Sequence, residues 1–166
     1  MIWKTCFACV MLSILAAIVP AEEKSKNLLK PTNKPDSWQF EQHETAKGTI
    51  AADDDAIVFD VTASDGTDWH VQAYQVGLDL KDGKEYVLTF KAKASADRSV
   101  GVAAGINQDD WHAIGLQENT DLTKEWKEIK FEFKADQTVD KKNRVGISMG
   151  NEKGKVWVKD MMLTMK

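Results

Sequence analysis

The chain has 166 residues, of which 43% are hydrophobic, and a formal net charge of −4 at pH 7. This length is sufficient for one domain with a hydrophobic core of its own. The mildly acidic charge argues against nucleic acid and anionic lipid surfaces as partners, so a neutral ligand suits the chain better.

Residues 1–21 have the composition of a secretory signal peptide. Lys4 supplies a positive charge, an apolar stretch extends from Cys6 to Val19, and small residues precede Glu22 at a suitable cleavage site. The stretch is too short for a membrane span, and the alternative is an uncleaved N-terminal anchor. We expect a mature chain that begins at Glu22, is secreted to the periplasm or the extracellular space, and does not insert into a membrane.

Both cysteines of the chain, Cys6 and Cys9, lie within that predicted signal peptide. The mature chain would therefore contain no disulfide, no thiol nucleophile and no cysteine metal site. Loss of Lys4 would leave 21 basic residues against 26 acidic ones, a net charge of −5. The folded domain must then be stabilised by its core alone.

The mature chain is predicted to consist of a polar lead-in and one domain. Residues 22–37 contain Pro31 and Pro35 and predict an N-terminal tether that leads into a first edge segment. Residues 38–166 contain eight short runs in which apolar and polar side chains alternate, with turn residues between them. The predicted strands are 56–61, 69–76, 86–92, 99–105, 111–116, 129–133, 144–149 and 156–162. This spacing predicts an all-β fold, an antiparallel β-sandwich, and residues 122–126 are expected to form a loop.

The sequence contains none of the common catalytic motifs. It lacks a Gly-x-Ser-x-Gly elbow, a His-Glu-x-x-His zinc motif and a glycine-rich phosphate loop. The three histidines, His43, His70 and His112, have no further ligand in a suitable pattern, and Asp53–Asp55 are typical of a solvated turn. We therefore expect a binding protein rather than an enzyme.

Two predicted strands carry polar side chains on the face opposite their apolar residues. In strands 69–76 and 144–149, apolar residues alternate with a second set that shares the other face. That set consists of His70, Gln72, Tyr74, Arg144 and Ser148. If the two strands belong to one sheet, these side chains form a polar surface with an aromatic edge, which suits a ligand rich in hydroxyl groups.

Five tryptophans follow the predicted signal peptide, and most are expected to pack in or around the core. Trp38, Trp69 and Trp126 stand near strand starts and are expected to be structural. Trp157 is expected to cover a sheet edge or to be exposed. Trp111 differs because it follows a polar loop and opens a strand of small residues. We expect a sugar ring to stack on Trp111, because the C–H face of a pyranose packs well on an indole.

These residues belong to a pattern that resembles carbohydrate-binding modules of families 4, 9 and 22. The pattern consists of Asn27-Leu28-Leu29, Trp38, Trp69-His70-Val71-Gln72, the run Leu80 to Ala92 (Leu-x-x-Gly-x-x-Tyr-x-Leu-x-Phe-x-Ala), Trp111, Trp126 and the run Val156 to Thr164. The resemblance covers nearly the whole mature chain and implies a β-jelly-roll with a concave cleft for a glucan, xylan or related chain. By position it implies that Trp111 is the main aromatic platform. The other cleft residues that it implies are Gln72, Tyr74, Arg144 and Ser148.

The opening of the chain departs from that family pattern. The family commonly has Asn-Gly-x-Phe-Glu after its first leucines, with acidic groups that help to bind a structural calcium ion. Here residues 30–33 read Lys-Pro-Thr-Asn. Asp160 is then the only candidate calcium ligand, and no other cofactor is expected.

The leading hypothesis is a secreted, non-catalytic carbohydrate-binding module that grips a polysaccharide chain in a concave cleft. In this hypothesis Trp111 stacks on a sugar ring and Tyr74 flanks it. Gln72, His70 and Arg144 form hydrogen bonds with sugar hydroxyls.

Two other functions are compatible with the sequence. The alternative is a secreted jelly-roll scaffold or protein-interaction domain of the cell envelope, which would pack Trp111 against its own chain and bind no sugar. The third hypothesis is a glycosidase, which needs two carboxylates at a set separation. Asp110 and Glu118 are the nearest pair to Trp111 in the sequence. The sequence identifies no envelope or enzyme partner protein.

Overall fold

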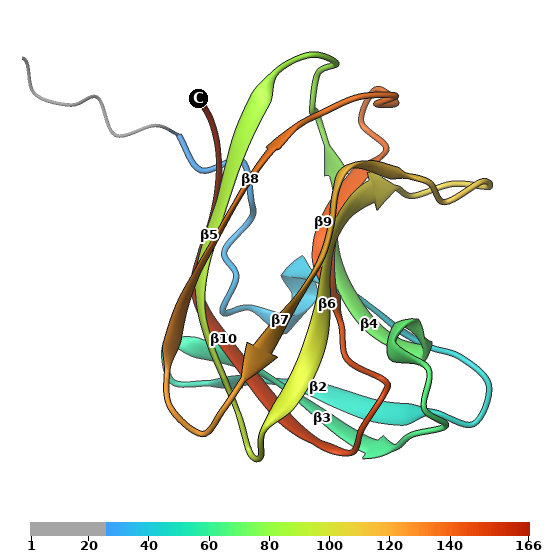
Figure 1. Ribbon diagram of the computed structural model, residues 1–166, viewed down its shortest axis with the longest axis vertical. Helices are drawn as coiled ribbons and strands as arrows, with labels where there is room; N and C mark the ends of the chain where they lie inside the picture. Colours follow the sequence, from blue (N-terminus) through green and yellow to red (C-terminus); the bar gives the residue numbers. More distant parts are fainter. Residues whose placement is uncertain (1–25) are drawn as a thin grey trace, which may run out of the picture.

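The computed structural model describes residues 26–166, and the predicted signal peptide lies outside the described residues. Within them the chain forms ten β-strands in two five-stranded antiparallel sheets that lie face to face (Figure 1). This arrangement confirms the predicted antiparallel β-sandwich of jelly-roll type. No helix in residues 26–166 has the length and apolar character needed to cross a bilayer.

Each sheet joins strands that are far apart in the sequence. The front sheet has the order β1-β4-β9-β6-β7, and the back sheet has the order β2-β3-β10-β5-β8. The front strands are β1 (Gln39–Gln42), β4 (Val71–Leu78), β9 (Asn143–Ser148), β6 (Arg98–Ile106) and β7 (Ala113–Leu122). The back strands are β2 (Lys47–Asp53), β3 (Ala56–Ala63), β10 (Gly154–Met165), β5 (Glu85–Ala94) and β8 (Lys127–Lys134). Two short 3-10 helices, η1 (Pro35–Ser37) and η2 (Asp68–His70), precede β1 and β4.

All eight predicted strands are present, but the prediction misses β1 and β2. These strands read Gln-Phe-Glu-Gln and Lys-Gly-Thr-Ile-Ala-Ala-Asp, with little apolar alternation. Both lie at the edge of their sheets, where one side of the strand is unpaired and less of it is buried. Residues 122–126 end β7 and form the turn before β8, as expected.

Two strands begin later than predicted, with consequences for the tryptophans at their starts. β4 begins at Val71 because residues 68–70 form η2. β7 begins at Ala113 because Asp110 and Trp111 have φ angles of 89° and 48°, outside the range of an extended strand. Side chains at these positions therefore do not follow the alternation of the strands.

The described part of the predicted tether lies against both sheets. The backbone N–H of Leu28 donates to the carbonyl of Leu163 on β10 at 2.8 Å. The backbone N–H of Lys30 donates to Oε1 of Gln75 on β4 at 2.8 Å. Leu29, between them, is buried in the core. Residues 28–30 thus connect the two sheets through β10 and β4.

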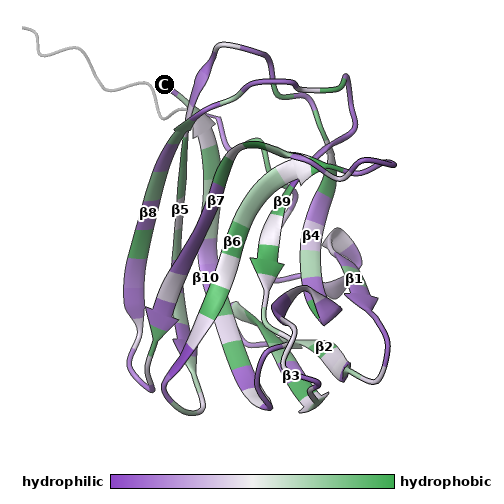
Figure 2. Cartoon of the chain, turned by 45° about the vertical axis from the view of Figure 1, so that its right-hand side comes forward, coloured by the Kyte–Doolittle hydropathy of each residue, from purple (hydrophilic) through white to green (hydrophobic). Residues whose placement is uncertain are grey.

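The core lies between the sheets and is built from alternating residues. Bands of opposite hydropathy follow one another along the strands in Figure 2. On β5 the inward residues are Tyr86, Leu88, Phe90, Ala92 and Ala94, all buried. Trp38 packs edge-to-face on Phe59 with ring centroids 5.5 Å apart, so its predicted structural role is confirmed.

On the outer face of the front sheet, β4 approaches the backbone of β9 very closely at Gly146. A Cβ atom at Gly146 on β9 would lie 2.0 Å from the carbonyl oxygen of Ala73 and 2.6 Å from Cδ1 of Tyr74. The ring of Tyr74 therefore lies over bare β9 backbone. Only glycine fits at position 146 without movement of the neighbouring strand or ring.

We expect Gly146→Ala to lower the free energy of unfolding by about 2 kcal/mol or more, because β4 or the Tyr74 ring must move to admit the methyl group. Gly101→Ala on β6 is the matched control, since its Cβ would meet Asp68 Oδ2 at 3.3 Å and Ser148 Cβ at 3.4 Å. Urea denaturation of both variants measures the difference. Equal unfolding midpoints for the two variants would contradict this account of position 146.

Candidate functional site

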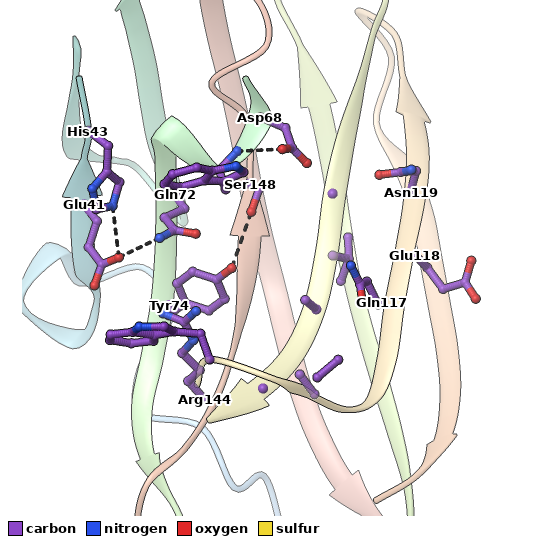
Figure 3. Close-up of a pocket in the computed structure, with 18 residues that line it drawn as sticks. Glu41, His43, Asp68, Gln72, Tyr74, Gln117, Glu118, Asn119, Arg144 and Ser148 are labelled. Carbon is purple, nitrogen blue, oxygen red and sulfur yellow. Dashed lines mark hydrogen bonds and ion pairs between the residues drawn. The ribbon is translucent and has the colours of Figure 1, made fainter. Parts of the chain in front are cut away.

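The outer face of the front sheet carries a cleft of about 660 Å³ (Figure 3). Strand register arranges the residues of this face in three rows across the sheet. One row is Glu41, Gln72, Ser148, Gly101 and Asn119. The next is Tyr74, Gly146, Ala103 and Gln117. The third is Arg144, Gly105 and Ala113. The front sheet therefore brings together five of the six residues that the sequence nominated: Trp111, Tyr74, Gln72, Arg144 and Ser148.

The floor of the cleft follows β6. Within the cleft, the outer face of this strand presents Gly101, Ala103 and Gly105, while the residues between them point into the core. The longer side chains of β4 and β9 stand on one side of this floor, and Gln117 and Asn119 of β7 stand on the other. A groove between two polar walls results, and it can accommodate an extended chain.

Hydrogen bonds hold the polar wall of β4 in one orientation. Nε2 of Gln72 donates to Oε2 of Glu41 at 2.6 Å, so the amide oxygen of Gln72 points away from Glu41 and into the cleft (Figure 3). The hydroxyl groups of Tyr74 and Ser148 lie 3.4 Å apart. The wall thus presents an amide and two hydroxyl groups that can donate to or accept from a polar ligand.

Arg144 lies close to two aromatic rings at the end of the cleft where Trp111 stands. Its Cζ lies 3.9 Å from the ring centroid of Tyr74 and 4.9 Å from that of Trp111. Arg144 is only 8% exposed, whereas Trp111 is 52% exposed. The guanidinium group therefore attracts the indole by a cation–π interaction while leaving about half of it open to solvent.

Trp111 is carried by the connection between β6 and β7, and polar bonds hold this connection in place. Nδ1 of His112 lies 2.8 Å from Oδ2 of Asp110, and Nε2 lies 3.0 Å from the carbonyl oxygen of Gln137. Because both partners are acceptors, both bonds form only when the ring is protonated at both nitrogens. The bond to the Gln137 carbonyl, followed by the bond to Asp110, raises the pKa of His112 above its ordinary value.

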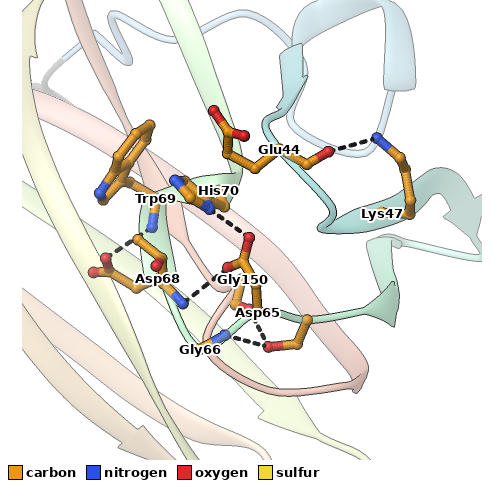
Figure 4. A network of polar contacts seen from close by, with 10 residues as sticks. Glu44, Lys47, Asp65, Gly66, Asp68, Trp69, His70 and Gly150 are labelled. Carbon is orange, nitrogen blue, oxygen red and sulfur yellow. Dashed lines mark hydrogen bonds and ion pairs between the residues drawn. The ribbon is translucent and has the colours of Figure 1, made fainter.

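Trp69 lies at the other end of the cleft on η2, and its position corrects the prediction that it packs. It is 50% exposed and lines the cleft. His70 is instead buried and is not among the lining residues; its Nδ1 lies 2.7 Å from Oδ2 of Asp65 (Figure 4). The helical turn reverses the alternation expected for an extended strand, so His70 anchors η2 and Trp69 faces outward. The hydrogen bond from His70 lowers the pKa of Asp65.

The polar lining residues that were not nominated from the sequence include Glu41, Asp68, Gln117 and Asn119. Glu41 lies on β1, which the sequence did not predict, and Asp68 lies on the unpredicted turn η2. Gln117 and Asn119 alternate along β7 and would have been found by parity had β7 been assigned to this sheet. In each case, the sequence does not show which elements border the cleft.

The carboxylate pair considered for a glycosidase is not assembled in the cleft. Asp110 bonds to His112 and is not among the lining residues. Glu118 is a lining residue, but it alternates with Gln117 and Asn119 on β7 and its carboxylate projects away from them (Figure 3).

The candidate calcium ligand, Asp160, pairs with a lysine on the back sheet. Oδ2 of Asp160 lies 3.0 Å from Nζ of Lys91, an exposed ion pair. Residues 26–166 contain no group of three or more His, Cys, Asp or Glu side chains arranged to hold a metal ion. The function proposed below is derived without a bound cation.

We expect an NMR titration to give His112 a pKa above 6.5, the value of the free side chain. Since the folded pKa is raised, the stabilising bonds are fully present below the unfolded pKa and are lost as the pH rises through the folded pKa. Asp110→Asn should lower the His112 pKa because it removes one charged acceptor. A His112 pKa at or below 6.5 in the unaltered protein would contradict the two-acceptor arrangement.

Comparison with known proteins identifies the family of this fold and cleft. The family model for the carbohydrate binding domain of the CBM4/9 type matches residues 31–153. Among curated protein sequences, none matches the chain.

Solved structures of low sequence identity share the fold. A CBM4 structure has a TM-score of 0.70 at 21% identity, over 84% of this chain and 93% of that chain. The second N-terminal cellulose-binding domain of β-1,4-glucanase C from Cellulomonas fimi has a TM-score of 0.66 at 20% identity, over 87% and 97%. The CBM22-1 xylan-binding domain from Paenibacillus barcinonensis has a TM-score of 0.58 at 9% identity, over 87% and 97%. Since the family model spans both sheets and most of the cleft, the chain belongs to the CBM4/9 carbohydrate binding domain family, which confirms the resemblance in its sequence.

Proposed function

We propose that this protein is a secreted, non-catalytic module that binds a polysaccharide chain, such as a glucan or a xylan, along the groove of the front sheet. The observation that carries the proposal is the half-exposed indole of Trp111 at the end of a groove with polar walls. The names of structural neighbours, a cellulose-binding and a xylan-binding domain, support this ligand class. Secretion rests on the composition of residues 1–21.

The chemistry of the groove matches the two sides of a sugar ring. The C–H face of a pyranose is apolar and can pack on an indole, while its equatorial hydroxyl groups need donors and acceptors in the ring plane. Trp111 and Trp69 are each about half exposed at opposite ends of the groove. Gln72 and Asn119 provide amides between those ends. A ligand that contacts both tryptophans would be an oligosaccharide rather than a single sugar.

The alternative function is a scaffold that binds no sugar. Such a protein should have a flat outer face on the front sheet, and its Trp111 should pack against its own chain. The half-exposed indole and the hollow along β6 favour the binding module instead. Non-catalytic action is proposed because Asp110 bonds to His112 outside the lining, so it does not form a carboxylate pair with Glu118 in the groove.

We expect Trp111→Ala to weaken polysaccharide binding about tenfold or more, because it removes the stacking surface. Affinity electrophoresis through gels that contain soluble glucan, xylan, mannan or galactan measures the effect. Trp126→Ala is the matched control: Trp126 is 37% exposed, but it lies against Lys93 and Lys159 of the back sheet. It should leave the mobility in every gel unchanged.

Circular dichroism of both variants must first show that each remains folded. Retardation of the unaltered protein by one polysaccharide, reduced only in Trp111→Ala, would support the module. An equal loss in both variants would contradict the assignment of Trp111, and unchanged mobility of the folded, unaltered protein in all gels would favour the scaffold.

A further inference from the structure

Arg144 is a buried charge for which the protein provides no acidic partner. It is more than nine-tenths buried, and its Nε and Nη1 atoms are enclosed without a hydrogen-bond acceptor. In the described part of the chain, no carboxylate forms an ion pair with it. The other buried arginine, Arg98, also has an Nε without an acceptor, but its Nη2 donates to the carbonyl oxygens of Met149 and Glu152 and to Oδ1 of Asn151.

Burial of Arg144 without a hydrogen-bond acceptor lowers the stability of the fold unless a bound group supplies that acceptor. A guanidinium group stays protonated at any physiological pH, and buried N–H groups without partners oppose folding. The rings of Tyr74 and Trp111 offer their π faces to the cation, but they accept no hydrogen bond in the guanidinium plane. A carboxylate is the group whose two oxygens match that plane.

The space next to Arg144 is suitable for such a group from a ligand. Its partner across β6 is Gly105, and the next residue in the row is Ala113, so neither provides an acceptor on a side chain. All three residues line the groove. A ligand that lies along β6 therefore passes directly beside the guanidinium group.

Three acidic residues line the groove, and two of them, Glu41 and Asp68, lie at its other end and already have partners. The third, Glu118 on β7, projects away from Gln117 and Asn119 (Figure 3). Glu41 belongs to the row of Ser148, four residues along β9 from Arg144, which is about 13 Å in a strand. It accepts from Gln72, and Asp68 accepts from the backbone N–H of Trp69 at 2.7 Å. The groove thus has an acidic end beside Trp69 and a basic end beside Trp111.

From this polarity we infer that the natural ligand is a polysaccharide with uronic acid residues, and that Arg144 binds a ligand carboxylate while Trp111 stacks on the same or the adjoining sugar. The inference rests on the proposed function and specifies its ligand. It replaces the neutral ligand expected from the net charge, because the buried guanidinium group sets the charge at this end of the groove. Since Nε and Nη1 are enclosed in the free protein, the indole of Trp111 shifts when the carboxylate enters. Trp111 has a left-handed backbone conformation on a connection outside the strands, so such a shift leaves the sheet intact.

The test compares matched ligands on the unaltered protein. Glucuronoxylan, polygalacturonate and alginate are each used beside their carboxyl-reduced forms, in which every carboxylate has become a hydroxymethyl group. Isothermal titration should show that at least one acidic polymer binds about tenfold or more tightly than its reduced form. Tryptophan fluorescence should change on binding of the acidic form.

Two variants assign the difference to Arg144. Arg144→Gln should remove the preference for the acidic form, whereas Lys93→Gln should retain it. Lys93 is a matched cation, since its Nζ lies 5.0 Å and 5.1 Å from the ring centroids of Trp126 and Trp157 on the back sheet. Should Arg144→Gln fail to fold, the ligand comparison on the unaltered protein still decides the inference.

Each outcome separates this inference from the proposed function. Equal affinity for the acidic and reduced forms, or preference for neutral chains, would overturn the role of Arg144 and leave the binding module standing. A preference that survives in folded Arg144→Gln would also overturn that role. Failure of every acidic, reduced and neutral polysaccharide to bind would overturn both.

Discussion

The cleft depends on the absence of a side chain at Gly146. With no Cβ at this position, the ring of Tyr74 lies over the backbone of β9. That ring supports the guanidinium group of Arg144, which in turn lies close to the indole of Trp111. A stack of one bare backbone position and three planar groups therefore places the principal aromatic surface, and each member is fixed by the one beneath it.

The two sheets differ in how their charged side chains are paired. On the outer face of the back sheet, Lys91 and Lys159 pair with Asp160 and Asp55 at 3.0 Å and 2.9 Å. Such exposed pairs contribute little to stability, and they leave no buried charge unpaired. In the cleft, Arg144 is buried without an acidic partner. An unsatisfied group held inside a rigid sheet is better explained by a ligand than by folding.

Both exposed tryptophans of the cleft stand on short connections that local polar bonds hold in place. Asp65 and His70 fix η2 beneath Trp69 (Figure 4), and His112 fixes the connection that carries Trp111. The sheets supply the groove, and these connections supply the aromatic surfaces at its ends. This division is common in binding proteins, since loops can vary while the sheet that carries them stays unchanged.

Alternation along each strand is a local property, so the sequence alone determined the eight strands other than β1 and β2 and the shared face of Gln72 and Tyr74. It also indicated Trp111, which follows a polar loop. Only the tertiary structure decided that β4, β9 and β6 are neighbours and that Gly105 therefore lies beside Arg144, because strand pairing joins residues far apart in the chain. The outward position of Trp69 likewise depends on a single helical turn, and one such turn is too short to leave a period in the sequence.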